Sequence, residues 1–188
     1  MSYQTRATRQ PLTVFVSYDR TKDQLYRNYF DSLFADNKDI AILNSVQIGE
    51  MGENSKPEAL RQKIRDEYLL DSTVTVVLVG ADTWSYKHVD WEIGSSLRDA
   101  RYNSRSGLLG IVLPSYPRLE NDRYDPHTLP PRLNANIRDG YAQLHNWAYD
   151  AAAVSQWIQE ADERRDKIVP DNTFPSFTNN LSGSKWHE

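Results

Sequence analysis

One acidic side chain is placed where it could support catalysis. Glu92 lies with His88 and Ser96 at intervals of four residues, which places the three polar side chains on one face of a helix. Trp84 and Trp91 lie close by in the sequence. A carboxylate among aromatic rings and hydroxyls can stabilise a positive charge that develops in a transition state. The spacing alone fits an exposed or salt-bridged helix glutamate at least as well, because such residues are common.

A strand and a helix are predicted to position Glu92. The strand covers 74–79, an apolar run without polar alternation, which is typical of a parallel strand buried on both faces. The helix follows, with Ser85 as its N-cap, because apolar residues recur at helical spacing. These residues are Val89, Ile93, Leu97 and Ala100. The connection 80–85 then lies at the carboxyl edge of the sheet, where open α/β folds bind ligands.

The rest of the chain alternates between strands and helices. Further strands are predicted at 12–16, 41–46, 108–113 and 141–147. Helices are predicted to begin near Thr21, Ser55 and Asp150, the first two with capping-box spacing. The first helix should pack inward through Leu25, Tyr26, Tyr29, Phe30 and Leu33. The alternation predicts an α/β, flavodoxin-like fold of three layers, with a five-stranded parallel sheet in the order 2-1-3-4-5.

Three segments depart from this alternation. Residues 1–11 are predicted to form a flexible N-terminal arm before one domain over 12–169. Within that domain, 115–140 is proline-rich and is predicted to be an irregular excursion between the fourth and fifth strands. Residues 170–188, rich in Asn, Ser, Thr and Pro, are predicted to form a loosely ordered tail.

Composition excludes several classes of function. The 188 residues include no cysteine, so thiolate catalysis and cysteine metal sites are excluded. The net charge is −4 with the signs interspersed, so nucleic acid is not an expected partner. No apolar run is long enough for a membrane span or a signal peptide, and we expect a cytoplasmic protein without a membrane partner. The histidines show no metal-ligand spacing, and no metal site is expected. They are His88, His127, His145 and His187.

The remaining motifs narrow the chemistry. The predicted turn after the first strand reads SYDRTKD and has no glycine, so a dinucleotide-binding Rossmann turn and a P-loop are both missing. A receiver domain needs an acceptor aspartate and a lysine after the third and fifth strands, but Asp82 comes two residues late and Trp147 replaces the lysine. Most glycosidases need two carboxylates. Nicotinamide instead leaves NAD as a neutral base without being protonated, so one glutamate could suffice. Loss of nicotinamide from NAD is therefore one reaction that fits such a site, and no prosthetic group is expected.

Several motifs together are similar to a known family. These are TVFVSYDR, the glycine-containing loop after the second strand, and TVTVVLVGADTWSYKHVDWEI. They resemble bacterial TIR and TIR-like domains, most closely those of the Thoeris antiphage system, over about 12–157. The resemblance implies that Glu92 is catalytic, and that loop 48–54, with Ile48, Gly49 and Gly52, serves in gating and assembly. The implied substrate-binding residues are Phe15, Ser17, Tyr18, Asp19, Trp84 and His88.

The resemblance also implies an activity. NAD would be cleaved between nicotinamide and ribose, and a cyclic or rearranged ADP-ribose signal would activate a partner effector; assembly into a homo-oligomer is a further expectation. Many relatives have tryptophan one helical turn before the glutamate, where this chain has His88. Two other hypotheses remain open. The protein could be a non-catalytic TIR scaffold that acts through its loop, or a hydrolase of free nucleosides or nucleotides.

Overall fold

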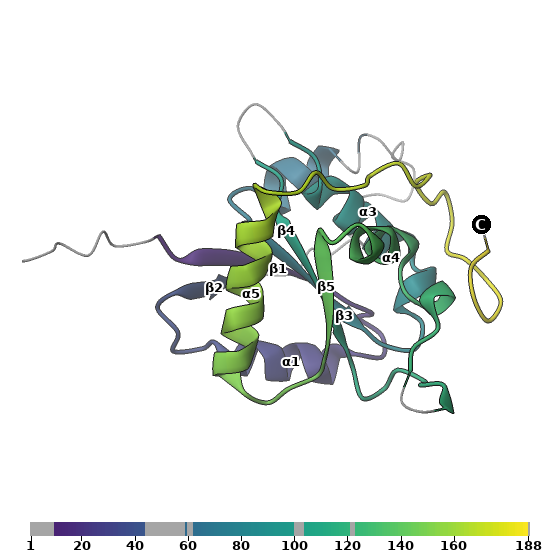
Figure 1. Cartoon of the computed structure of the whole chain (residues 1–188), viewed down its shortest axis with the longest axis horizontal. Helices are drawn as coiled ribbons and strands as arrows, with labels where there is room; N and C mark the ends of the chain where they lie inside the picture. Colours follow the sequence, from purple (N-terminus) through teal and green to yellow (C-terminus); the bar gives the residue numbers. More distant parts are fainter. Residues whose placement is uncertain (1–9, 44–58, 60–61, 100–103, 121–122, 188) are drawn as a thin grey trace, which may run out of the picture.

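Five parallel strands form the centre of the molecule. The protein is described by a computed structural model over residues 10–43, 59, 62–99, 104–120 and 123–187. The strands form one sheet in the order β2-β1-β3-β4-β5 (Figure 1). They are β1 (Leu12–Ser17), β2 (Ile40–Ile42), β3 (Val74–Val79), β4 (Gly107–Val112) and β5 (Ala142–Asn146). Every pairing is parallel, which confirms the predicted fold class and strand order.

The central strand β3 lies between β1 and β4. Val76 pairs with Val16 on one side and with Leu109 on the other. All six residues of β3 are buried, as expected for an apolar run without polar alternation. β3 has the predicted bounds, whereas β2 begins one residue earlier than predicted and ends at Ile42, so that Leu43 lies beyond the strand. The rest of its predicted span, 44–46, lies outside the described residues.

Helices cover both faces of the sheet (Figure 1). One face carries α1 (Gln24–Leu33) and α5 (Ala151–Arg165). The other face carries α3 (Lys87–Ser96), α4 (Pro131–Arg138) and a π-helical turn, η2 (Ile64–Tyr68). Because side chains alternate along a strand, each strand supplies both apolar layers. The three-layer arrangement is therefore confirmed. None of the helices in the described part of the chain is both long and apolar enough to cross a membrane.

Two of the predicted helix starts are wrong. The N-cap of α1 is Asp23 rather than Thr21, because the Asp19 carboxylate accepts the Thr21 and Lys22 N–H groups and holds them in a turn. The N-cap of α3 is Tyr86, since Ser85 belongs to a short 3-10 helix, η3 (Thr83–Ser85). The predicted cap at Asp150 is confirmed by its hydrogen bond from the Ala152 N–H at 2.9 Å. The predicted start at Ser55 lies outside the described residues.

The buried face of α1 also differs from the prediction. Phe30 is buried, but Leu25 is 62% exposed and Tyr29 is 47% exposed. Arg27 is buried instead and donates hydrogen bonds to the carbonyl oxygens of Val16 and Leu43. Bonds between a guanidinium and backbone carbonyls permit this burial, which an apolar periodicity does not predict.

Two segments predicted to be irregular or loose contain ordered structure. The excursion 115–140 includes a 3-10 helix, η5 (Pro126–Thr128), and α4, whose Pro131 suits the first turn of a helix. The tail has no helix or strand between 170 and 187. It nevertheless donates and accepts hydrogen bonds with α3 and α4, so the structure differs from the prediction of a loosely held tail. Of the predicted N-terminal arm, residues 1–9 lie outside the described part.

Candidate active site

Glu92 on α3 lies against the carboxyl end of β1. The Ser17 hydroxyl donates a hydrogen bond to Glu92 Oε2 at 2.5 Å, and the Arg20 guanidinium donates to Oε1 at 3.4 Å. Glu92 is only 1% exposed. Ser17 is the last residue of β1 and Arg20 lies in the loop after it, so the adjacency of β1 and β3 brings both to the helix that follows β3. This is the edge at which open α/β sheets bind ligands.

The electrostatics of Glu92 are dominated by its burial. Burial raises the pKa of the Glu92 carboxyl above its ordinary value of 4.5. Charges on His88 and Arg20 and the hydrogen bond from Ser17 act in the opposite direction without cancelling the rise. The anionic form therefore depends on these neighbours.

His88 is half-buried and lies one turn before Glu92. Its Nε2 is 3.3 Å from the carbonyl oxygen of Tyr18, which can only accept, so this contact selects the protonated Nε2. The His88 ring also lies 5.3 Å from the ring of Tyr86. His88 is thus held by the loop after β1.

The other sequence-predicted residues have different surroundings. Phe15 is fully buried in an apolar cluster with Trp91 and two residues of the η2 region. The Tyr18 ring packs in the opposite layer, where its hydroxyl donates to Gln24, and only its carbonyl meets His88. Asp19 is buried and shapes the loop through backbone N–H groups, while Trp84 is buried in η3. The structure thus brings Ser17, Arg20, His88 and Glu92 together, along with the backbone of Tyr18.

Arg20 is a site residue that was not predicted from the sequence. One signal could have identified it, because a 2-1-3 strand order places the loop after the first strand beside the helix after the third. A second ion pair, between Lys22 and Asp82, joins the loop after β1 to the loop after β3. The predicted gating residues Ile48, Gly49 and Gly52 lie outside the described residues. Within the part that the structure describes, no group of three or more histidine and acidic residues could hold a metal ion.

The fold and the site define the class of protein. The molecule is an α/β, flavodoxin-like domain with a 2-1-3-4-5 sheet and a buried glutamate that faces a serine at the end of β1. Residues 15–118 match the family described as the TIR-like domain of the Thoeris protein ThsB. The match spans more than half of the chain, and the chain therefore belongs to this family. A comparison with curated proteins finds no match.

The matched region contains the candidate site but not the whole fold. Ser17, Arg20, His88 and Glu92 all lie within residues 15–118. α4, β5, α5 and the tail lie beyond them. The match thus covers the elements that carry the candidate site, and α4, β5 and α5 complete the fold outside the matched range.

Proposed function

We propose that this Thoeris-type TIR protein of antiphage defence cleaves NAD at the nicotinamide–ribose bond and forms a cyclic or rearranged ADP-ribose signal that activates a partner effector. The observation that carries the proposal is the buried Glu92 carboxylate, held by Ser17 Oγ at 2.5 Å at the ligand-binding edge of the sheet. NAD enters as the substrate, and the chemistry needs no prosthetic group.

The proposed reaction begins with loss of nicotinamide. The bond between ribose C1′ and the pyridinium nitrogen breaks, and its electron pair leaves with nicotinamide, which becomes neutral. The ribose is left as an oxocarbenium ion, and the anionic Glu92 stabilises its charge. Because Glu92 is 1% exposed, little water screens this interaction. A nucleophile within the same molecule, or water, then forms the new bond to C1′ and gives up its proton.

The neighbours of Glu92 have separate roles in this proposal. Ser17 fixes one carboxylate oxygen and so orients the other towards the ribose. His88 offers a ring one turn away that can stack on the substrate or donate a hydrogen bond to it. Arg20 pairs with Glu92 at 3.4 Å and must leave Oε1 or share it when the ribosyl cation forms.

The direct test is substitution of Glu92. Purified protein, with and without a phage-derived trigger, is incubated with NAD, and nicotinamide and ADP-ribose products are measured by mass spectrometry. We expect Glu92→Gln to lower kcat by at least ~10²-fold, since it removes the charge that stabilises the transition state. Glu160→Gln, on the solvent side of α5, is the matched control and should leave turnover unchanged.

Other outcomes would redirect the assignment. Unchanged turnover in Glu92→Gln would contradict the proposal. If NAD is untouched and loop substitutions at Gly49 or Gly52 abolish defence in cells, the protein acts as a TIR scaffold. A substrate panel of NAD, ATP and deoxynucleosides distinguishes NAD cleavage from hydrolysis of free nucleosides or nucleotides.

A further inference from the structure

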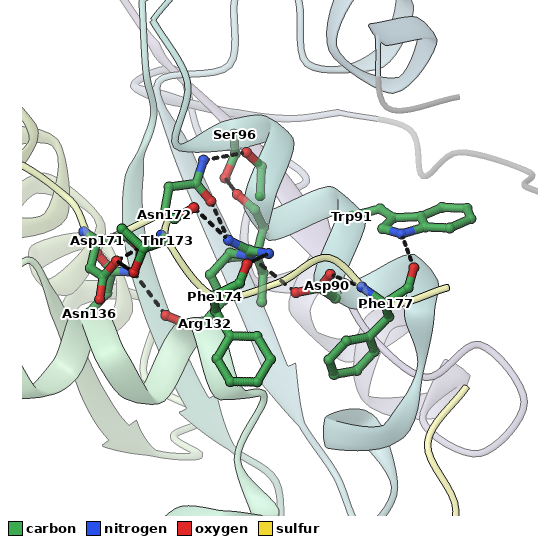
Figure 2. Close-up of polar contacts among 12 residues, drawn as sticks. Asp90, Trp91, Ser96, Arg132, Asn136, Asp171, Asn172, Thr173, Phe174 and Phe177 are labelled. Atoms are coloured by element: carbon green, nitrogen blue, oxygen red, sulfur yellow. Dashed lines mark hydrogen bonds and ion pairs between the residues drawn. The ribbon is translucent and has the colours of Figure 1, made fainter. Parts of the chain in front are cut away.

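The C-terminal tail runs along the helix that carries Glu92. It leaves α5, crosses to the face of α3 and α4 (yellow in Figure 1), and contacts α3 from its start to its last turn. Figure 2 shows Asn172, Phe174 and Phe177 of this segment beside Asp90, Trp91 and Arg132. The tail lies outside residues 15–118, the region that matches the family.

Arg132 of α4 is the centre of the contact. Its side chain is 2% exposed, and all three guanidinium nitrogens donate hydrogen bonds. Nε donates to Asp90 Oδ1 at 3.1 Å, and Nη2 donates to the Phe174 carbonyl at 2.7 Å. Nη1 donates to Asn172 through Oδ1 at 2.6 Å and through the backbone oxygen at 3.1 Å. Arg132 therefore joins α4, α3 and the tail in one buried network.

The tail also bonds directly to α3. The Phe177 N–H donates to Asp90 Oδ2 at 3.0 Å, and the Trp91 indole donates to the Phe177 carbonyl at 2.8 Å. Asn172 Nδ2 donates to the carbonyl of Gly94 at 2.9 Å. An added Cβ at Gly94 would lie 3.2 Å from Arg132 Nε, so the guanidinium is packed closely against the helix backbone.

The first turn of α3 is capped by the tail. Tyr86 supplies no side-chain cap, so the Lys87 N–H has no partner on the N-cap side chain. Asn180 Oδ1 accepts the Lys87 N–H at 3.0 Å and so takes the place of an N-cap. The Leu181 N–H donates to the Ser85 carbonyl at 2.8 Å, immediately before the helix.

These contacts adjoin the candidate active site in sequence and in space. The tail holds Lys87, Asp90 and Trp91, which flank His88 and Glu92 on the same helix. Glu92 itself faces Ser17 on β1. An α-helix moves as a rigid element. If the tail contacts were lost and α3 shifted, the distance between Glu92 and Ser17 would therefore change.

We propose that the tail segment 171–181 clamps α3 and thereby sets the position of Glu92, with Arg132 as the positioning residue. Its catalytic consequence rests on the proposed NAD cleavage, whereas its structural consequence does not. A misplacement of the order of 1 Å at a catalytic group lowers rates by up to ~10²-fold. A buried arginine that donates to acceptors on three residues can hold a helix to such tolerance, because its fork geometry is fixed.

The test uses full-length protein and two matched pairs of variants. Arg132→Met is compared with Arg138→Met, which removes an exposed arginine from the end of the same helix. Asn180→Ala removes the exposed cap residue and is compared with Asn179→Ala at the neighbouring exposed position. Amide hydrogen exchange of α3, kcat and KM for NAD, and thermal unfolding are measured for each.

Arg132→Met is expected to raise exchange of the α3 amides by about tenfold or more, and to lower kcat by about 10- to 100-fold. KM should change less than about threefold, since ground-state binding does not depend on the exact position of Glu92. Arg132→Lys should retain part of the rate, because it keeps the charge beside Asp90 but cannot reach every acceptor. Asn180→Ala should raise exchange at the first turn and lower kcat about threefold, and both controls should resemble the unsubstituted protein.

Contrary results distinguish the two proposals. Unchanged α3 exchange in folded Arg132→Met and in Asn180→Ala would overturn the clamp. Raised exchange with an unchanged kcat would overturn its role in positioning Glu92. If Arg132→Met does not fold, Asn180→Ala decides the question, because its side chain is exposed. If the unsubstituted protein releases no nicotinamide from NAD, the proposed function fails, while the exchange measurement still decides whether the tail restrains α3.

Discussion

At the scale of single residues, Glu92 has to meet two opposed requirements. The proposed chemistry needs an anion, but the site is buried, and burial favours the neutral acid. His88, Arg20 and Ser17 supply the charges and the hydrogen bond that oppose this preference. His88 lies on α3, Ser17 is the last residue of β1, and Arg20 lies in the loop after it. The charge state of Glu92 therefore depends on the contact between α3 and the end of β1.

The raised pKa of Glu92 predicts opposite effects of pH on activity and stability. As pH rises, Glu92 becomes anionic, so kcat/KM for NAD should increase through its folded-state pKa, and Glu92→Gln should lack this acid limb.

Between the ordinary value of 4.5 and the raised folded-state pKa, the unfolded state binds fewer protons than the folded state, so Glu92 lowers stability as pH rises. Glu92→Gln should therefore be at least as stable as the unsubstituted protein near pH 7. Rate profiles and urea unfolding between about pH 4 and 8 measure both effects. A Glu92→Gln variant that loses stability near neutral pH would contradict the assignment.

Arg20 should tune this titration. Arg20→Gln removes a cation that favours the Glu92 anion, so the acid limb of kcat/KM should move to higher pH. We expect kcat/KM near pH 7 to fall about fivefold, equivalent to about 1 kcal/mol for a partly exposed pair. Lys22→Gln is the control, because Lys22 lies in the same loop but pairs with Asp82. An acid limb that shifts equally in both variants would show that net charge, rather than the Arg20 contact, controls Glu92.

At the scale of elements, strands were predicted more accurately than helix ends. β3 has its predicted bounds because five of its six residues are apolar and all but Leu78 are β-branched, a composition that favours a buried strand. The cap at Thr21 failed because the Asp19 carboxylate holds the Thr21 and Lys22 N–H groups in a turn. At the start of α3, Asn180, which is distant in sequence, accepts the Lys87 N–H. Arg27 replaced apolar residues in the buried face of α1 for a similar reason, since its partners are carbonyls of β1 and of the residue after β2.

The packing of α5 on β4 provides a prediction at this scale. A Cβ at Gly107 would collide with the backbone of Ala161 in α5, so Gly107→Ala must push the helix from the sheet. We expect a loss of about 1–3 kcal/mol in the free energy of unfolding, measured by urea titration. Gly110→Ala in the same strand is the matched comparison. Its Cβ would meet the tip of the Leu144 side chain, which can rotate away, so the loss should be smaller. Equal losses would contradict this account.

At the scale of the whole molecule, the order of strands was predictable but the path of the tail was not. Alternating elements and the adjacency of the first and third strands brought Ser17, His88 and Glu92 to one edge, as expected. The tail has the polar composition of a loose segment. Its Asn and backbone groups instead bond to Arg132 and to α3, and no local periodicity encodes partners about 40 to 90 residues away. Buried polar networks of this kind are specified by the fold as a whole.

The partners of Arg132 and Asp90 in the tail have a consequence for biosynthesis. During translation the tail leaves the ribosome after every strand of the sheet. The core can therefore form before the tail makes its bonds to Arg132 and α3. If the chain cleaves NAD as proposed, it would reach its full rate only as a late step of maturation. Nascent chains and products of premature termination would carry Glu92 but turn over NAD more slowly than the finished chain.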